Sequence, residues 1–222
     1  MADEQRAMEL RESHREKVAR NEVRLSPLWA RPCRAYNVHI ELDSHTKSSL
    51  ERIQQSLYQA EPNLLVCPEK TLHVSLAWLV AVHASYQVDK DSLWKRHGEE
   101  WMAELRRIAA QRTGFRITYA HVVATDSAVI ALAQPSEPVN RIREIIRQRL
   151  RLPAETRNEA DLVHTTLFRY RGALSDPEKL LAMLEDTNAD ATAEVEELVV
   201  SKELVYPSLE AEVLGRLPLA SR

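Results

Sequence analysis

The chain has 222 residues, 44% hydrophobic and 28% charged, a globular composition with room for one large domain or two small lobes. Its net charge of −3 excludes a general polycation, so any nucleic-acid role has to rest on a local patch or a short oligonucleotide end. The N-terminus is charged throughout, no apolar run approaches about 18 residues, and the two cysteines are Cys33 and Cys67. We therefore expect a cytoplasmic protein with free thiols and without a secretory signal or membrane span.

Apolar periodicity predicts an α+β protein and not a regular alternation of strands and helices. The 3-4 spacing of apolar residues indicates helices at about residues 3–20, 45–58, 92–111, 139–150 and 177–184. Alternating patterns indicate strands at about residues 36–42, 72–79, 115–123, 128–133, 162–168, 195–205 and 209–217. A polar hairpin turn, Thr125-Asp126-Ser127, joins the strands at 115–123 and 128–133.

The N-terminal segment differs from the rest of the chain because its apolar stripe is thin. Only Met8, Leu10 and Val18 interrupt a helix of charged and small residues. We interpret residues 1–30 as a peripheral helical extension that docks on the body, on a partner or on a second copy. Residues 31–222 then form a single bilobal domain.

Two strand-like stretches carry a histidine and a hydroxyl two residues apart. LVHTTLF contains His164 and Thr166, and LHVSLA contains His73 and Ser75. Side chains at positions i and i+2 of a strand share one face, so each pair points the same way. The question is whether the two pairs face each other.

A repeat of the surrounding pattern gives these motifs their weight. Ser and Thr make up 25 of 222 residues, so eight histidines should give about one His-x-Ser/Thr by chance, and the chain has three. The offsets from Ile40 to Ile130 and from His73 to His164 are 90 and 91 residues, which indicates a strand-helix-strand unit used twice. The third motif, at His83, has no such lead-in and is treated as the chance example.

Two H-x-S/T motifs at this separation resemble the 2H phosphoesterase superfamily, which includes 2′-5′ RNA ligase-like proteins and cyclic phosphodiesterases. The resemblance covers about residues 36–217 and implies two lobes with pseudo-two-fold symmetry, antiparallel-rich sheets around a central cleft, and helices outside. It implies that His73 and His164 are catalytic and that Ser75 and Thr166 bind the substrate. The closing segment resembles the family's last two strands, where Tyr206 is the candidate aromatic residue near the cleft.

Phosphodiester hydrolysis needs a base for water, an acid for the leaving oxygen, and donors for the non-bridging oxygens. Two histidines can share the acid and base roles because imidazole titrates near neutral pH, so this arrangement requires neither a metal nor a cofactor. The expected substrates are a 2′,3′-cyclic nucleotide, a 2′-5′-linked oligonucleotide or an RNA end with a cyclic phosphate. Which histidine is the base, and whether the outcome is hydrolysis or ligation, stays open.

Two alternatives belong to other functional classes. The first is a nucleotide-binding or RNA-binding module that keeps the same cleft without turnover. The second is an unrelated α+β interaction protein in which both histidines are core residues. The binding module would bind nucleotides without giving product. The distance between the imidazoles tests the second alternative, because an acid and a base must both reach the reacting atoms, whereas burial in separate cores would prevent this.

Several arginines surround the second motif, and strand parity separates them. Arg169 has the parity of Thr165 and is expected to face away from His164 unless a bulge intervenes. For Arg143, Arg147 and Arg149 we expect a solvated helix face.

The remaining aromatic and histidine residues are read mostly as structural. Trp94 and Trp101 lie seven residues apart on a predicted helix, which favours core packing over base stacking. His39 and His121 lie on predicted strands without hydroxyl partners and are expected to be structural. A nucleobase could stack on any of three tyrosines, Tyr36, Tyr119 and Tyr206.

Overall fold

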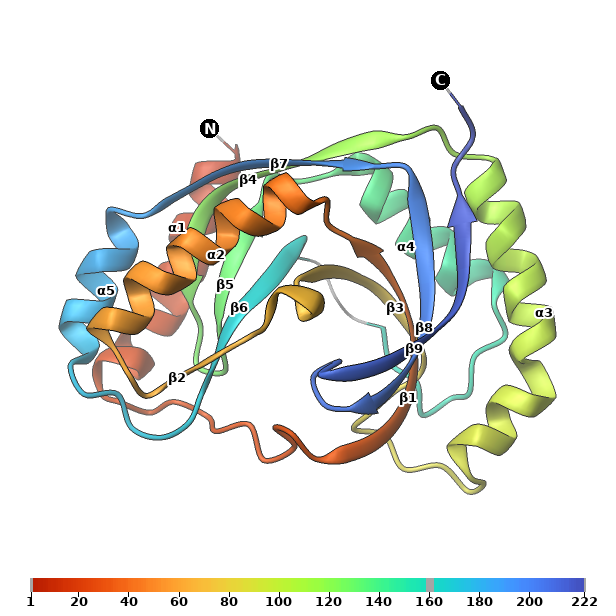
Figure 1. Cartoon of the computed structure of the whole chain (residues 1–222), viewed down its shortest axis with the longest axis horizontal. Coiled ribbons are helices and arrows are strands. Elements are labelled where there is room, and N and C mark those ends of the chain that lie inside the picture. The colour runs from red at the N-terminus through yellow and green to blue at the C-terminus, as the bar shows by residue number, and fades with distance from the viewer. Residues whose placement is uncertain (1, 159–161, 222) are drawn as a thin grey trace.

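Two antiparallel sheets form the centre of the computed structural model, which describes residues 2–158 and 162–221 (Figure 1). The four-stranded sheet has the order β3 (His73–Val80), β1 (Pro32–Glu41), β8 (Glu197–Val205) and β9 (Glu210–Pro218). The five-stranded sheet has the order β2 (Leu64–Val66), β6 (His164–Tyr170), β5 (Val129–Ala133), β4 (Phe115–Ala124) and β7 (Asn188–Val195). The expected α+β architecture with antiparallel sheets is confirmed.

Helices lie outside the two sheets, and polar residues fix where they begin. They are α1 (Ala2–Ala19), α2 (Ser44–Ala60), α3 (Lys90–Ala110), α4 (Glu137–Arg149) and α5 (Pro177–Glu185), with a short 3-10 turn at Glu69–Thr71. The Asp43 carboxylate accepts from the Thr46 backbone N–H at 2.8 Å, and the Ser136 hydroxyl caps α4 in the same way. All five helices were predicted to within two residues at each end.

Each half of the chain places its helix on the sheet of the other half. Helix α2 follows β1, yet it packs against β7 and β6, where the Gln54 amide donates to the Leu167 carbonyl at 2.8 Å. Helix α4 follows β5, yet it packs against β3 and α3. In Figure 1, α3 and α4 accordingly lie on one side of the molecule and α1, α2 and α5 on the other. The two halves are therefore interlocked.

Two strands were missed in the sequence, each for a physical reason. Strand β7 alternates exposed and buried residues, but three of its buried residues are Ala189, Ala191 and Ala193, whose hydropathy gives little strand signal. Strand β2 has only three residues and pairs with the end of β6. Strand β7 leads through residue 196 into β8, so a nearly continuous ribbon links the two sheets (Figure 1).

The aromatic residues of α3 belong to the core, as predicted. Trp101 is 1% exposed, and the ring of Trp94 stacks on Tyr36 with centroids 4.6 Å apart. Tyr36 also donates to Asp91 at 2.6 Å, and Tyr119 is fully enclosed. Tyr36 and Tyr119 are not available to stack on a nucleobase, because both rings are buried in packing contacts. Both cysteines are free thiols, as expected.

Helix α1 docks on the body of the protein. Asp126, in the turn between β4 and β5, accepts hydrogen bonds from Lys17 and from Arg24, which follows the helix. Arg11 donates to the carbonyl oxygen of Val122 at 3.4 Å, on the part of β4 beyond its pairing with β7. Among the described residues, no helix is both long and apolar enough to span a membrane.

Candidate active site

The two motif strands, β3 and β6, meet beside their histidines. The Thr165 hydroxyl donates to the His73 carbonyl oxygen at 3.1 Å and contacts the Tyr119 hydroxyl at 2.7 Å. His73 and His164 are the first residues of their strands, and both are partly buried. The structure thus brings together two motifs that are 91 residues apart in the chain.

The strand register gives both parts of the repeat the same offset of 91 residues. His73 pairs with Glu41 across β1, and His164 pairs with Leu132 across β5. Glu41 and Leu132 are also 91 residues apart, so Ile40 is equivalent to residue 131 and not to Ile130. The 90-residue offset inferred from the sequence was misaligned by one.

Both motif strands contain a bulge at the same place. The register shifts at Leu76 in β3 and at Leu167 in β6, where one extra residue enters the strand. Because of the bulge, the third residue after each hydroxyl residue lies on the face of the histidine. These residues are Trp78, three after Ser75, and Arg169, three after Thr166. The expectation that Arg169 faces away from His164 is therefore wrong, because the bulge reverses its parity.

The two histidines are held in similar ways, although their charged neighbours differ. Nδ1 of His164 lies 3.4 Å from the Leu162 carbonyl oxygen, and His73 makes a backbone hydrogen bond at Thr71, again two residues earlier. This arrangement leaves Nε2 facing the site, where that of His73 lies 3.2 Å from the Ser75 hydroxyl. Burial lowers the pKa of each imidazole to about 4, so both are neutral at pH 7.

Arg143 connects α4 to the first motif strand. It is 3% exposed, and its guanidinium donates to the Ser75 carbonyl oxygen at 2.6 Å. Burial is the main cause of the lowered pKa of His164. The backbone hydrogen bond at Leu162 raises this pKa, and the Arg143 charge lowers it further. The expectation of a solvated position is wrong for Arg143, whereas Arg147 and Arg149 on the same helix are exposed.

His39 lies beside His73, and this position was not predicted from the sequence. Its ring centroid is 4.9 Å from that of His73, and its register partner in β3 is Ser75. Nδ1 of His39 lies 2.9 Å from Oδ1 of Asn37, which also accepts from the Ser201 hydroxyl at 2.9 Å. The signal in the sequence was the alternation of Asn37, His39 and Glu41 along one strand, which places three polar residues on one face.

Aromatic residues close the other end of the site. Tyr206 is 7% exposed and packs edge-on against the His83 ring, with centroids 5.6 Å apart. The partly buried Trp78 packs against the small cluster that Tyr206 forms with Ala35 and Val82. Burial lowers the pKa of His83, and the Arg169 charge lowers it further. Burial raises the pKa of Tyr206, and the Arg169 charge opposes this effect. The residue treated as a chance motif, His83, is therefore near this end of the site.

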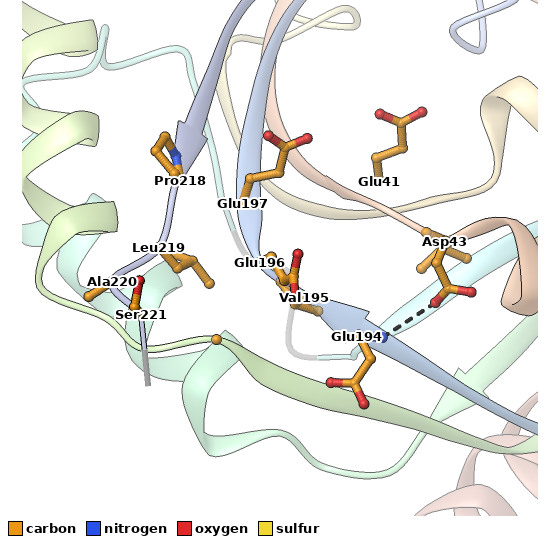
Figure 2. A pocket seen from close by; sticks show the side chains of 12 residues that line it. Glu41, Asp43, Glu194, Val195, Glu196, Glu197, Pro218, Leu219, Ala220 and Ser221 are labelled. Carbon is orange, nitrogen blue, oxygen red and sulfur yellow. Dashed lines mark hydrogen bonds between the residues drawn. The ribbon is translucent and has the colours of Figure 1, made fainter.

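Two cavities adjoin Glu41 on β1. One of about 500 Å³ begins at His73 and His39. The other, of about 870 Å³, has a strongly acidic lining, and its carboxylates are labelled in Figure 2. Three of those acids have structural partners: Arg216 pairs with Glu41 and Glu197, and Asp43 accepts from the Glu194 backbone. Among the described residues, no three His, Cys, Asp or Glu side chains are grouped to hold a metal ion.

Solved structures share this architecture. TT0787 of Thermus thermophilus has a TM-score of 0.61 at 15% identity, with 85% of this chain and 99% of that chain covered. A structure described as a phosphoesterase has a TM-score of 0.59 at 14% identity, covering 84% and 99%. LigT of E. coli, in complex with ATP, has a TM-score of 0.58 at 15% identity, covering 85% and 99%. No protein-family model and no curated protein sequence matches the chain.

These likenesses concern the fold, because the identities are low. The match extends over 85% of this chain and 99% of each of these two chains, so it includes most of the fold and not one element of it. The chain therefore has the fold of LigT and TT0787.

Proposed function

We propose that the chain is a phosphoesterase that uses His73 and His164 as its acid and base and hydrolyses a cyclic nucleotide phosphate or a 2′-5′ phosphodiester. One observation carries the proposal. Two equivalent strands present a histidine and a hydroxyl each, and the Thr165 hydrogen bond to His73 joins them beside those histidines. This geometry supports a reaction centred on one phosphate.

The reaction needs one imidazole in each protonation state. The neutral histidine takes a proton from water as the water oxygen bonds to phosphorus, and the bond from phosphorus to the ester oxygen breaks. The imidazolium of the other histidine donates its Nε2 proton to that leaving oxygen. The two histidines have then exchanged protonation states, and the product is a phosphomonoester.

The groups around the phosphate suit its charge. The hydroxyls of Ser75 and Thr166 share the faces of the histidines and can donate to non-bridging oxygens. Arg169 lies on the face of Thr166 and supplies a positive charge. A bound phosphate anion also favours the imidazolium, which raises the histidine pKa from its low value in the free protein.

Nucleotides are the substrate class that the neighbours support. LigT has been crystallised with ATP, with 3′-AMP and with NADP+. Trp78, on the motif face of β3, offers an aromatic surface for a base. A 2′,3′-cyclic nucleotide, a 2′-5′ linkage and an RNA end with a cyclic phosphate all combine a base with the required phosphodiester.

A nucleotide-binding module without turnover is the second candidate. The lowered pKa values favour it, since neither His73 nor His164 is protonated at pH 7 in the free protein and the general acid is then missing. This candidate predicts binding of cyclic nucleotides with no product after long incubation.

Single substitutions at the histidines test the proposal. We expect His73→Ala and His164→Ala each to lower kcat/KM for a 2′,3′-cyclic nucleotide by about 1,000-fold, because each removes a proton-transfer group. The matched control is His45→Ala, an exposed histidine on α2, which should keep full activity. Circular dichroism should show that all three variants stay folded.

The outcomes distinguish the candidates. Turnover by the double variant, or turnover lost on adding EDTA and regained with a divalent cation, would contradict the two-histidine mechanism. Tight nucleotide binding by the wild type without any product would favour the binding module.

A further inference from the structure

The two halves of the protein present opposite chemistry on equivalent strands. With the 91-residue offset, Asn37, His39 and Glu41 of β1 correspond to Ala128, Ile130 and Leu132. The pairing of His39 with Ser75 and of Ile130 with Thr166 confirms this equivalence. Beside the first motif the surface is therefore polar, and beside the second it is apolar.

Helix α1 covers the apolar half. Ile130 and Leu132 are each 4% exposed and belong to a separate cluster with Val123 and Ala128. Leu10 of α1 and Leu162 pack against this cluster. A substrate group could rest on this face only by displacing them.

The equivalent region of the first half is hollow. The cavity of about 500 Å³ begins at His73 and continues across β1, β8 and β9, and its lining includes His39, Ser201, Val213 and Arg216. This volume lies in the usual range for pockets that bind small ligands, about 300 to 1,000 Å³. Space for the organic part of a substrate is thus present beside the first motif.

His39 supplies a hydrogen-bond acceptor to this cavity. Oδ1 of Asn37 can only accept, so Nδ1 of His39 carries the proton that they share and Nε2 is left as an acceptor. Burial, with smaller effects from neighbouring positive charges, holds the pKa of His39 well below its usual value, so the ring stays neutral. A neutral acceptor suits a hydroxyl or amino group.

The charges in the cavity balance. Arg216 lies 2.8 Å from Glu41 and also pairs with Glu197, so its charge is already neutralised. The exposed Lys70 and Glu210 at the cavity carry opposite charges. This lining favours an uncharged polar group over a second phosphate.

We propose that the cavity beside His39 binds the nucleoside of the substrate, with Nε2 of His39 accepting a hydrogen bond from one of its hydroxyl or amino groups. The inference rests on the proposed function, which places the phosphate at His73 and His164. The substrate then extends from that phosphate over the first half of the protein only, because α1 occupies the equivalent face of the second half.

A pair of exposed valines tests the cavity. Val213→Trp fills it, and Val88→Trp places the same ring on a residue that does not line it; the two valines are 50% and 41% exposed. We expect Val213→Trp to lower kcat/KM for 2′,3′-cyclic AMP about tenfold and to leave ethylene phosphate, a cyclic phosphate without a nucleoside, unchanged. Val88→Trp should change neither. Equal effects of Val213→Trp on both substrates, or none, would overturn the assignment.

Binding separates failure of the cavity from failure of catalysis. Titration calorimetry should show that the wild type binds 3′-AMP about tenfold more tightly than inorganic phosphate, and that Val213→Trp removes this preference. His39→Phe should reduce it as well, because it removes the acceptor. No preference in the wild type would refute the nucleoside site even in an active enzyme. A preference without turnover would leave the site in place and refute the phosphoesterase.

Discussion

At the residue scale, the protein holds three histidines neutral in one small region. His39, His73 and His164 each have a lowered pKa, with burial as the largest cause. An imidazole that the fold keeps neutral can accept a proton or a hydrogen bond without first losing one. It also makes the folded state sensitive to acid, because the unfolded chain binds those protons more readily.

The sign of that effect follows from the two states. For His73 and His164 the pKa falls from 6.5 to about 4 on folding, so the unfolded state binds more protons between these values. Their stabilising contribution is complete above pH 6.5 and is lost as the pH falls toward 4. We expect a loss of up to about 2 kcal/mol per histidine at pH 5. Denaturant unfolding at pH 7.5 and pH 5 measures it.

A double variant isolates this contribution from the other groups that titrate. His73→Gln/His164→Gln keeps polar side chains that do not titrate, so its free energy of unfolding should fall less between pH 7.5 and pH 5 than that of the wild type. The same fall in both proteins would show that the two histidines are not responsible.

The central residues of the site could be predicted from the sequence more readily than their neighbours. His73 and His164 are visible because a spaced pair repeats after 91 residues. The position of Arg169 was not predicted correctly, because strict alternation assumes a strand without a bulge. The signal was present as two consecutive apolar residues, Leu167 and Phe168, where alternation required one. The strand around Leu76 has the same signal.

At the scale of elements, the contact between α4 and β3 positions the first motif. Arg143 on α4 donates to the backbone of Ser75, the residue whose side chain shares a face with His73. The helix was predicted well, but its burial was not. A basic residue in a basic helix gives no indication that it points inward, since this depends on which sheet the helix covers.

Removal of that arginine should be costly. We expect Arg143→Ala to lower the free energy of unfolding by about 2 to 3 kcal/mol, since it removes a buried side chain and leaves the partly buried Ser75 carbonyl oxygen without this donor. It should also lower kcat, because the first motif strand loses a support.

The matched control lies on the same helix. Arg141 makes an exposed ion pair with Glu144, and Arg141→Ala should change stability by less than about 0.5 kcal/mol. Similar losses for Arg141→Ala and Arg143→Ala would show that the buried hydrogen bond has no special weight.

At the scale of the whole molecule, the exchange of helices couples the two halves. Helix α2 covers the five-stranded sheet and α4 covers the four-stranded one, so neither half retains its packing when the other unfolds. The strand-helix-strand unit in each half could be predicted from the sequence. The exchange could not, because local periodicity carries no information about which of two similar sheets a helix will cover.

Coupled halves should unfold together. Three of the four tryptophans lie on β3 or on α3, which packs on the four-stranded sheet: Trp78, Trp94 and Trp101. Their fluorescence therefore reports mainly on the side of the four-stranded sheet, whereas far-ultraviolet circular dichroism reports on both sheets. We expect the two signals to give the same midpoint and slope in urea. A fluorescence transition that precedes the loss of circular dichroism would show that the halves unfold independently.

Helix α1 has one more consequence, which concerns association. Strand β7 pairs with β4 only as far as His121, so the next three residues of β4 would present an open strand edge. Such edges pair readily with strands of other molecules and initiate aggregation. Arg11 of α1 donates to the Val122 carbonyl on that edge, and Leu10 covers the adjacent apolar face. Helix α1 thus covers the edge at which the five-stranded sheet could otherwise pair with a second molecule.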